Sequence, residues 1–213
     1  NNIVYYFNYL KYLIIIYIYI MKIILLRHEE RYEDPTFFTE LTSHGKMEAN
    51  SKIIKLLSKH KNDHIYCSPF LRTIQTVYPY CLKLNKKINI EYSLYEYVHS
   101  FQFNSSNWKE KFENIPDDKN TKFSDIIDQD YVSLINVDDI QFREDSTNLL
   151  NRTLSFIKFL ISKHKESKDT ILLVTHMAVI NSIKFIFDNT TSLDSEYPCG
   201  HIESIRVKKN MLF

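Results

Sequence analysis

Apolar and polar positions along the chain form two alternating patterns. Five short runs have the length of β-strands and cover residues 22–26, 64–67, 88–92, 171–174 and 202–207. Between them lie longer segments with apolar residues at helical spacing, at 43–60, from 68 onward, at 147–165 and after 176. Strands that alternate with helices predict an α/β fold, a three-layer α/β/α sandwich with a mostly parallel sheet covered on both faces.

The first predicted helix has a clear start and an apolar side. Thr42 or Ser43 can supply its N-cap, because both side chains carry a hydroxyl that accepts a backbone hydrogen bond. The apolar residues of its expected inward face are Met47, Ile53, Ile54 and Leu57.

The length of 213 residues suits one domain, which we place at 21–213. Residues 1–20 consist almost entirely of Ile, Tyr, Asn and Leu, and Asn8 and Lys11 interrupt their apolar character. We interpret them as a leader outside the fold, so a membrane is an expected partner only if this leader is a real anchor. Residues 97–146 are polar, aromatic and irregular, and we predict an insertion or lid over one end of the sheet.

The chain contains only two glycines, Gly45 and Gly200, where average usage would give about fifteen. A P-loop and a dinucleotide-binding fingerprint each need several glycines close together, because their backbones approach phosphate closely. Neither motif is therefore possible. If this protein handles phosphate, it must do so with side chains.

Net charge and cysteine content bear on the protein's partners and on its cellular compartment. The 27 basic and 26 acidic residues give a net charge of +1, which leaves no basic footprint for nucleic acid. Cys67, Cys81 and Cys199 are odd in number and widely spaced, which favours reduced thiols and a cytoplasmic location over a disulfide framework. The sequence does not indicate an oligomeric state.

Three predicted strands end in polar groups that can gather at one edge of the sheet. These are Arg27-His28, the turn at 68–72, and Thr175-His176. In parallel sheets, ligands bind at the carboxyl ends of the strands. We therefore expect two histidines and several arginines to meet in one site.

Such a cluster can transfer a phosphoryl group. A neutral imidazole is a nucleophile toward phosphorus, and neighbouring positive charges disfavour its protonated form. Guanidinium groups bind phosphate oxygens in pairs and compensate their charge in the transition state. The leaving alkoxide needs a proton from a carboxylic acid, for which Glu96, just past the third strand, is the first candidate. Glu29 and Glu30 are alternatives by proximity.

Four motifs together resemble the histidine phosphatase superfamily, which has the phosphoglycerate mutase-like fold. They are Leu26-Arg27-His28, Leu41-Thr42-x-x-Gly45, the run Ser68-Pro69-Phe70-Leu71-Arg72-Thr73-Ile74-Gln75-Thr76, and Val174-Thr175-His176. The run from Arg27 to Arg31 is similar to the Arg-His-x-Glu-Arg type of phosphatase in this superfamily, and Ser93-Leu94-Tyr95-Glu96 matches its Leu-x-Glu element.

The resemblance implies a role for each motif residue. His28 becomes phosphorylated, and Glu96 donates the proton and then activates water. The implied phosphate pocket consists of Arg27, Arg31, Arg72 and His176, and His176 also serves catalysis. The implied function is hydrolysis of a phosphomonoester on a small molecule or a phosphoprotein, without a metal or cofactor.

Two positions depart from the family pattern. Glu29 and Met177 stand where the family usually has a glycine after each motif histidine. A bulky residue is strained there if the backbone needs positive φ, and Glu29 would add negative charge if its side chain faced the phosphate. In the alternative, the backbone is ordinary and the side chain points away.

Other functions fit the same residues less well. A cysteine phosphatase needs five residues between its Cys and Arg, whereas Cys67 and Arg72 have four. The Asp-x-Asp pattern at Asp128 and Asp130 fits an aspartyl-phosphate enzyme, but no proper strand precedes it. Two alternatives remain open, a cofactor-dependent phosphoglycerate mutase and a catalytically silent phosphate-binding module.

Two further features lie outside these motifs, a pair of histidines and three aromatic residues of the insertion. His60 and His64 are four apart like a metal-binding pair, but they straddle the predicted helix end, so we interpret both as solvated. Phe101, Phe103 and Trp108 in the insertion suit an aromatic or apolar leaving group.

Overall fold

The computed structural model describes residues 19–33, 36–98, 122–140, 143–190, 192 and 194–208. Its centre is a five-stranded sheet of order β3-β2-β4-β1-β5. The strands are β1 (Tyr19–Arg27), β2 (His64–Cys67), β3 (Asn89–Ile90), β4 (Thr170–Thr175) and β5 (Ile202–Lys208). β1, β2, β3 and β4 run parallel and β5 is antiparallel to β1, which confirms the mostly parallel sheet.

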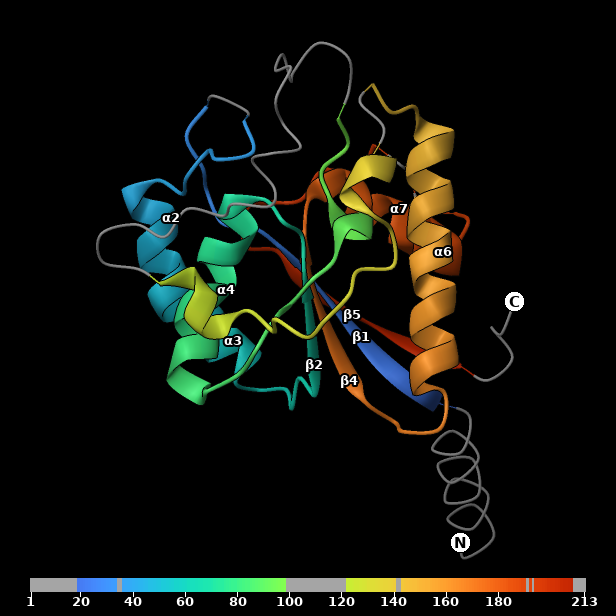
Figure 1. Cartoon of the computed structure of the whole chain (residues 1–213), viewed down its shortest axis with the longest axis horizontal. Helices are drawn as coiled ribbons and strands as arrows, with labels where there is room; N and C mark the ends of the chain where they lie inside the picture. Colours follow the sequence, from blue (N-terminus) through green and yellow to red (C-terminus); the bar gives the residue numbers. More distant parts are fainter. Residues whose placement is uncertain are drawn as a thin grey trace, which may run out of the picture.

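Helices cover both faces of this sheet (Figure 1). One layer comprises α2 (Ser43–Glu48), the π-helical turn η1 (Ala49–Ile53), α3 (Ile54–Leu57) and α4 (Leu71–Leu84). The other comprises α6 (Ser146–His164) and α7 (Met177–Phe187). The prediction of a three-layer α/β/α sandwich is confirmed.

Alternation along β1 explains the two layers. Ile23 and Leu25 pack with the α6 and α7 side, whereas Ile24 and Leu26 pack with the α3 and α4 side. All four side chains are fully buried. Because successive residues of a strand point to opposite faces, a strand covered on both sides reads as a continuous apolar run.

The first helix differs from its prediction on one side. Thr42 is the N-cap, and its hydroxyl accepts from the Gly45 amide at 3.0 Å, as expected. Met47, however, is 55% exposed, so its assignment to the inward face was wrong. The buried residues recur at every fourth position, at Gly45, Ala49, Ile53 and Leu57. The π turn widens the helix, so the buried side follows a spacing of four rather than 3.6.

Two strand boundaries also differ. β1 begins at Tyr19, so Tyr19 and Ile20, assigned by the sequence to the leader, are part of the sheet. Residues 1–18 lie outside the described residues, and their interpretation as a leader stays a prediction. β3 is reduced to Asn89–Ile90, with an isolated bridge from Ile88 to Ile127 beside it.

The predicted insertion is described in part. Residues 99–121, which include Phe101, Phe103 and Trp108, lie outside the described residues. The part from 122 to 140 contains the short 3-10 helices η3 (Phe123–Ile126) and η4 (Val137–Asp139). Within the described chain, we find no helix long and apolar enough to span a membrane.

Candidate active site

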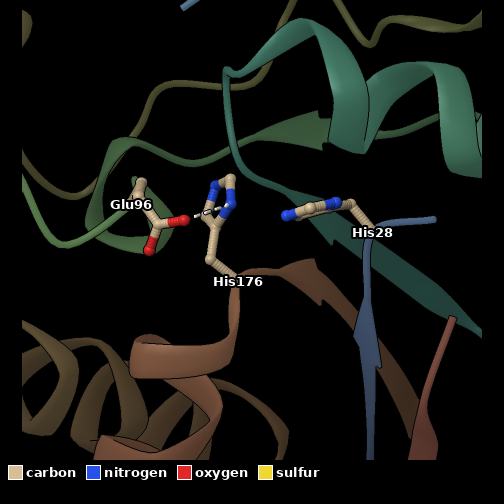
Figure 2. Close-up of side chains that lie close together, drawn as sticks. All are labelled: His28, Glu96 and His176. Carbon is tan, nitrogen blue, oxygen red and sulfur yellow. Dashed lines mark ion pairs between the residues drawn. The ribbon is translucent and has the colours of Figure 1, made fainter. Parts of the chain in front are cut away.

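His28 and His176 come together because their strands are neighbours. β1 and β4 pair in parallel with Arg27 opposite Thr175, so each histidine follows the carboxyl end of its strand. The His28 amide donates to the Thr175 carbonyl at 3.0 Å. The two imidazole rings lie 5.3 Å apart between centroids at an angle of 61°, and both are buried (Figure 2). The predicted edge of the sheet therefore brings the two histidines together in an edge-to-face arrangement.

One ring nitrogen of His28 is already committed. Its Nδ1 lies 2.7 Å from the Glu29 carbonyl oxygen, which can only accept a hydrogen bond, so Nδ1 carries the proton. Burial lowers the pKa of His28 well below its usual value, and the charges of Arg72 and His176 lower it further. The imidazole is thus neutral near pH 7, and Nε2 carries a free lone pair.

His176 lies between Glu96 and His28 (Figure 2). Its Nε2 is 2.8 Å from the Ser68 hydroxyl, and its Nδ1 is 3.2 Å from Glu96 Oε2. Burial lowers the pKa of His176 to about 4, although the Glu96 carboxylate acts in the opposite direction. His176 is also the N-cap of α7, so the site lies at a helix N-terminus, whose positive end favours an anion.

Glu96 reaches this pair from the loop that follows the 3-10 helix η2 (Tyr92–Leu94). Its Oε2 also lies 3.4 Å from Arg72 Nη2. Burial raises the pKa of Glu96, but His176, Arg72 and His28 together hold it well below its usual range. The carboxylate is therefore ionised in the free protein.

Arg72, in the first turn of α4, is the most deeply placed of the predicted arginines. Its side chain is 1% exposed, its Nη1 donates to the Thr36 carbonyl at 3.1 Å, and its guanidinium lies 4.4 Å from the centre of the Phe70 ring. Burial lowers the pKa of Arg72 to about 10. The Glu96 carboxylate raises this pKa, whereas the charges of Arg31 and Arg27 lower it further. The group stays cationic at neutral pH.

Arg27 and Arg31 donate to backbone carbonyls rather than to the Glu96 carboxylate in the described contacts. The Nη1 of Arg27 donates to the Tyr197 carbonyl. Arg31 folds back on its own loop, where its Nη1 donates to the carbonyls of Tyr32 at 2.7 Å and Glu33 at 3.1 Å. Both charges are close enough to lower the pKa of Arg72. Arg31 therefore affects the site through its charge. Its described hydrogen bonds go to its own loop and not to the histidines or Glu96.

Three buried nitrogen atoms in this cluster have no hydrogen-bond partner among the described residues. They are Arg27 Nε, Arg72 Nε and His176 Nδ1, the last of which meets Glu96 at ion-pair distance without hydrogen-bond alignment. An unsatisfied buried polar group costs about 1–3 kcal/mol. The oxygens of a bound phosphate would supply the missing acceptors.

The two residues that replace family glycines are not strained. Neither Glu29 nor Met177 has a positive φ. The Glu29 amide donates to Thr76 Oγ1 at 2.9 Å, and its carboxylate meets Lys52 Nζ at 3.5 Å, with burial raising its pKa and Lys52 lowering it. Its side chain is thus directed toward Lys52 of η1. Of the two expectations, the ordinary backbone is the one observed.

The carboxylates of the two alternative proton donors have other partners. Glu29 is directed at Lys52, as just described, and Glu30 is exposed, with its Oε1 accepting from Thr42 at 2.6 Å. Neither carboxylate is among the charges that shift the pKa of His28 or His176. Glu96 is the carboxylate that the fold brings to the site.

Arg152 on α6 is a residue that our sequence analysis missed. Its Nε and Nη2 bind the Glu144 carboxylate at 2.6 and 2.9 Å, and its guanidinium lies 3.6 Å from the centre of the Tyr95 ring. Its Nη1 donates to the Ser93 carbonyl at 2.7 Å, and its Nη2 approaches the Glu96 carbonyl at 3.5 Å. It therefore fixes the loop that carries Glu96. The sequence signal was a charged residue on the inward face of an amphipathic helix.

Two buried hydroxyl groups hold the loop that carries Glu96 and the His176 ring in place. Thr175 Oγ1 donates to the Leu94 carbonyl at 2.8 Å, which ties the loop to β4. Ser68 holds His176, as described above. Both residues are fully buried.

The donor atoms of His28, Glu96 and His176 lie within 4.8 Å of one another, a spacing that a metal ion can bridge. The guanidinium of Arg72, 3.4 Å from the same carboxylate, opposes a further cation there. The chemistry of the cluster favours an anion.

The rival nucleophiles are poorly placed. Cys67 is buried in the core, and burial raises the pKa of its thiol far above neutrality. Asp130 lies in an exposed turn, and its amide donates to Asp128 Oδ1 at 3.1 Å. Neither residue meets the histidines or Arg72 in the described contacts.

Comparison with known proteins agrees with this geometry. A family model described as the histidine phosphatase superfamily (branch 1) matches residues 24–191. No curated protein matches the chain significantly.

Several solved structures share the fold. Ecdysone phosphate phosphatase from Bombix mori, in complex with tungstate, has a TM-score of 0.59 at 13% identity, over 88% of this chain and 89% of that one. A mycobacterial glucosyl-3-phosphoglycerate phosphatase in complex with VO3 has a TM-score of 0.63 at 12% identity, over 90% and 94%. A variant phosphoserine phosphatase from Entamoeba histolytica, in complex with phosphoserine, has a TM-score of 0.56 at 17% identity, over 86% and 89%.

Proposed function

The chain belongs to the histidine phosphatase superfamily, branch 1, and we propose that it hydrolyses phosphomonoesters through a phosphohistidine formed on His28. The observation that carries the proposal is the state of His28. This imidazole is neutral, its proton is fixed on Nδ1 by the Glu29 carbonyl, and its Nε2 faces a cluster of cationic and unpaired donors.

In the first step, Nε2 of His28 attacks the phosphorus atom and the bond to the ester oxygen breaks. Charge on the phosphoryl oxygens is compensated by the buried guanidinium of Arg72, with Arg27 and the His176 imidazole beside it. The proton stays on Nδ1 and is donated to the Glu29 carbonyl, so the His28 ring gains positive charge and holds the phosphoryl group as a phosphoramidate.

The leaving oxygen needs a proton, and Glu96 is ionised in the free site. A bound phosphate dianion places negative charge beside Glu96 and so raises the pKa of its carboxyl. Glu96 therefore takes up a proton from solvent when the substrate binds, and donates this proton to the leaving alkoxide. The ionised carboxylate that remains is the form needed for the second step.

In the second step, Glu96 accepts a proton from water, whose oxygen attacks the phosphohistidine. The phosphorus–nitrogen bond breaks, inorganic phosphate leaves, and His28 returns to its neutral state. The same carboxylate serves as acid and then as base, in the order that the two half-reactions require.

Hydrolysis of p-nitrophenyl phosphate in excess EDTA tests this proposal. We expect activity that survives the chelator, a trapped phosphoryl group on His28 by acid-free mass spectrometry, and loss of both in His28→Asn. The matched control is His60→Asn, because His60 lies away from the site, with its Nδ1 3.3 Å from Lys22. Full turnover by His28→Asn would overturn the mechanism.

A catalytically silent phosphate-binding module remains the alternative, and the absence of a positive φ at Glu29 and Met177 favours the catalytic proposal over it. Such a module predicts binding of vanadate without turnover. The mutase alternative predicts conversion of 3-phosphoglycerate in the presence of a bisphosphate primer, and the same assay series separates all three. Screening phosphorylated metabolites and phosphopeptides would then identify the substrate class.

A further inference from the structure

A second cluster, of two histidines and one carboxylate, lies at the amino ends of the parallel strands, whereas His28 follows the carboxyl end of β1. Three residues form it: His64 at the start of β2, His164 at the end of α6, and Asp169 just before β4. Asp169 Oδ2 lies 2.9 Å from His164 Nδ1 and 3.2 Å from His64 Nε2. The sequence-based interpretation of His64 as merely solvated was therefore wrong.

The donor atoms fit a transition metal. All three lie within 4.8 Å of one another. A tetrahedral zinc site with bonds of about 2.0–2.2 Å separates its ligand atoms by about 3.3 Å, so the carboxylate and both rings are already near the required spacing. The two ring centroids lie 4.5 Å apart. Two imidazoles and one carboxylate are a ligand set that Zn²⁺ accepts.

Burial around the cluster is uneven in a way that suits a metal ion. The His164 side chain is only 4% exposed, whereas those of His64 and Asp169 are 39% and 18% exposed. The exposed side leaves room for water as a fourth ligand. The other ring nitrogen of His164, Nε2, lies 3.3 Å from the Tyr66 hydroxyl, and such outer contacts orient the histidines of metal sites.

Charged groups of both signs surround the cluster. Asp63 lies close enough to influence the Asp169 carboxyl, but its own charge is paired with Lys61 at 2.5 Å. Lys163, next to His164 in α6, opposes a cation. The attraction for a dication therefore rests on Asp169 and on the two imidazoles rather than on a general acidic field.

We propose that His64, His164 and Asp169 form a binding site for one divalent transition metal ion, with Zn²⁺ the preferred occupant. The ligands come from β2 and from the junction of α6 and β4, so the metal would link two parts of the chain that lie 105 positions apart, at His64 and Asp169. The site has a structural role and takes no part in the phosphoryl chemistry, which lies at the other ends of these strands.

Calorimetric titration of the metal-free full chain with Zn²⁺, and titration with Co²⁺ followed by visible absorption, test this site. We expect one tight site per chain, a tetrahedral Co²⁺ spectrum and a rise in Tm with added metal. His64→Gln and Asp169→Asn each remove a ligand on the exposed side. Each should weaken binding by more than the roughly 10–100-fold that outer contacts contribute.

Three further variants make the outcome decisive. His60→Gln, a nearby histidine outside the cluster, should bind as the wild type does, and Tyr66→Phe should bind more weakly. His28→Asn should keep the tight site, because its ring belongs to the other cluster. The proposal is wrong if no tight binding occurs, if both ligand variants bind normally, or if only His28→Asn loses the metal.

Discussion

The carboxylate of Glu29 fills the space beside Gly200. A β-carbon placed on Gly200 would lie 1.8 Å from Glu29 Oε1 and 2.4 Å from its carboxyl carbon. The Gly200 amide also donates to the His28 carbonyl at 3.1 Å. The side chain that replaces a family glycine after His28 is thus accommodated by one of the two glycines that the chain retains.

Gly200→Ala should destabilise the protein for two separable reasons. Gly200 has a φ of +65°, which costs a residue with a β-carbon about 1–3 kcal/mol, and the contact with Glu29 adds to this. Urea unfolding of Gly200→Ala, Glu29→Ala and the double variant measures both effects. We expect the double variant to recover the contact but not the φ cost. Strict additivity of the two single changes would contradict the contact.

Arg72→Ala should lower kcat by about 10²–10³, because comparable charge-stabilising donors contribute that much in other enzymes. Arg31→Ala should have a much smaller effect, since Arg31 bonds its own loop at 2.7 Å and acts on the site only through its field. Steady-state hydrolysis of p-nitrophenyl phosphate compares the two. Arg206→Ala, exposed on β5, serves as the control. Equal losses at Arg72 and Arg31 would show that Arg31 moves into contact with the substrate.

Local sequence patterns predicted the elements well because neighbouring residues determine them. β2 was predicted at 64–67 and observed at His64–Cys67, where polar residues bound a short apolar run. The position of His28 and His176 followed from a rule of parallel sheets, since each comes directly after its strand. Arg72 and Glu96 then followed from the motifs.

Features that depend on residues distant in the sequence could not be predicted from the local spacing of apolar and polar positions. The exposed Met47 follows from a π turn, and nothing in the local apolar spacing distinguishes it from an ordinary helix. The direction of Glu29 depends on Lys52, and the environment of His64 depends on residue 169, which is 105 positions away. Side-chain direction and long-range partners are set by packing, not by local propensity.

Removal of Arg152 should lower both stability and catalysis. Arg152→Met leaves the Glu144 carboxylate buried without its partner, a change that costs about 3–5 kcal/mol in comparable buried pairs. It also releases the carbonyls of Ser93 and Glu96, so kcat should fall while KM changes little. The double variant Arg152→Met/Glu144→Gln should regain much of the stability but not the rate. Recovery of both together would mean that Arg152 acts only on the fold.

Acidification should destabilise the protein through the buried histidines His28 and His176. The pKa of His176 falls from 6.5 to about 4 on folding, mainly through burial, and that of His28 is also lowered. The unfolded chain therefore binds more protons than the folded one in this range, and stability falls as the pH is lowered. The contribution is complete above about pH 6.5 and is lost toward pH 4. Glu96, whose pKa is also lowered on folding, adds in the same direction at still lower pH.

The free energy of unfolding from urea titrations, measured at intervals between pH 7.5 and 4, checks this dependence. His176→Gln replaces the titrating ring with a neutral amide, so its curve should be flatter than that of the wild type over this range. His44→Gln is the control, because His44 is largely exposed and meets Glu30 at 3.7 Å. A wild-type curve that stays level from pH 6.5 to 4, or a slope unchanged in His176→Gln, would contradict the burial of neutral imidazoles at this site.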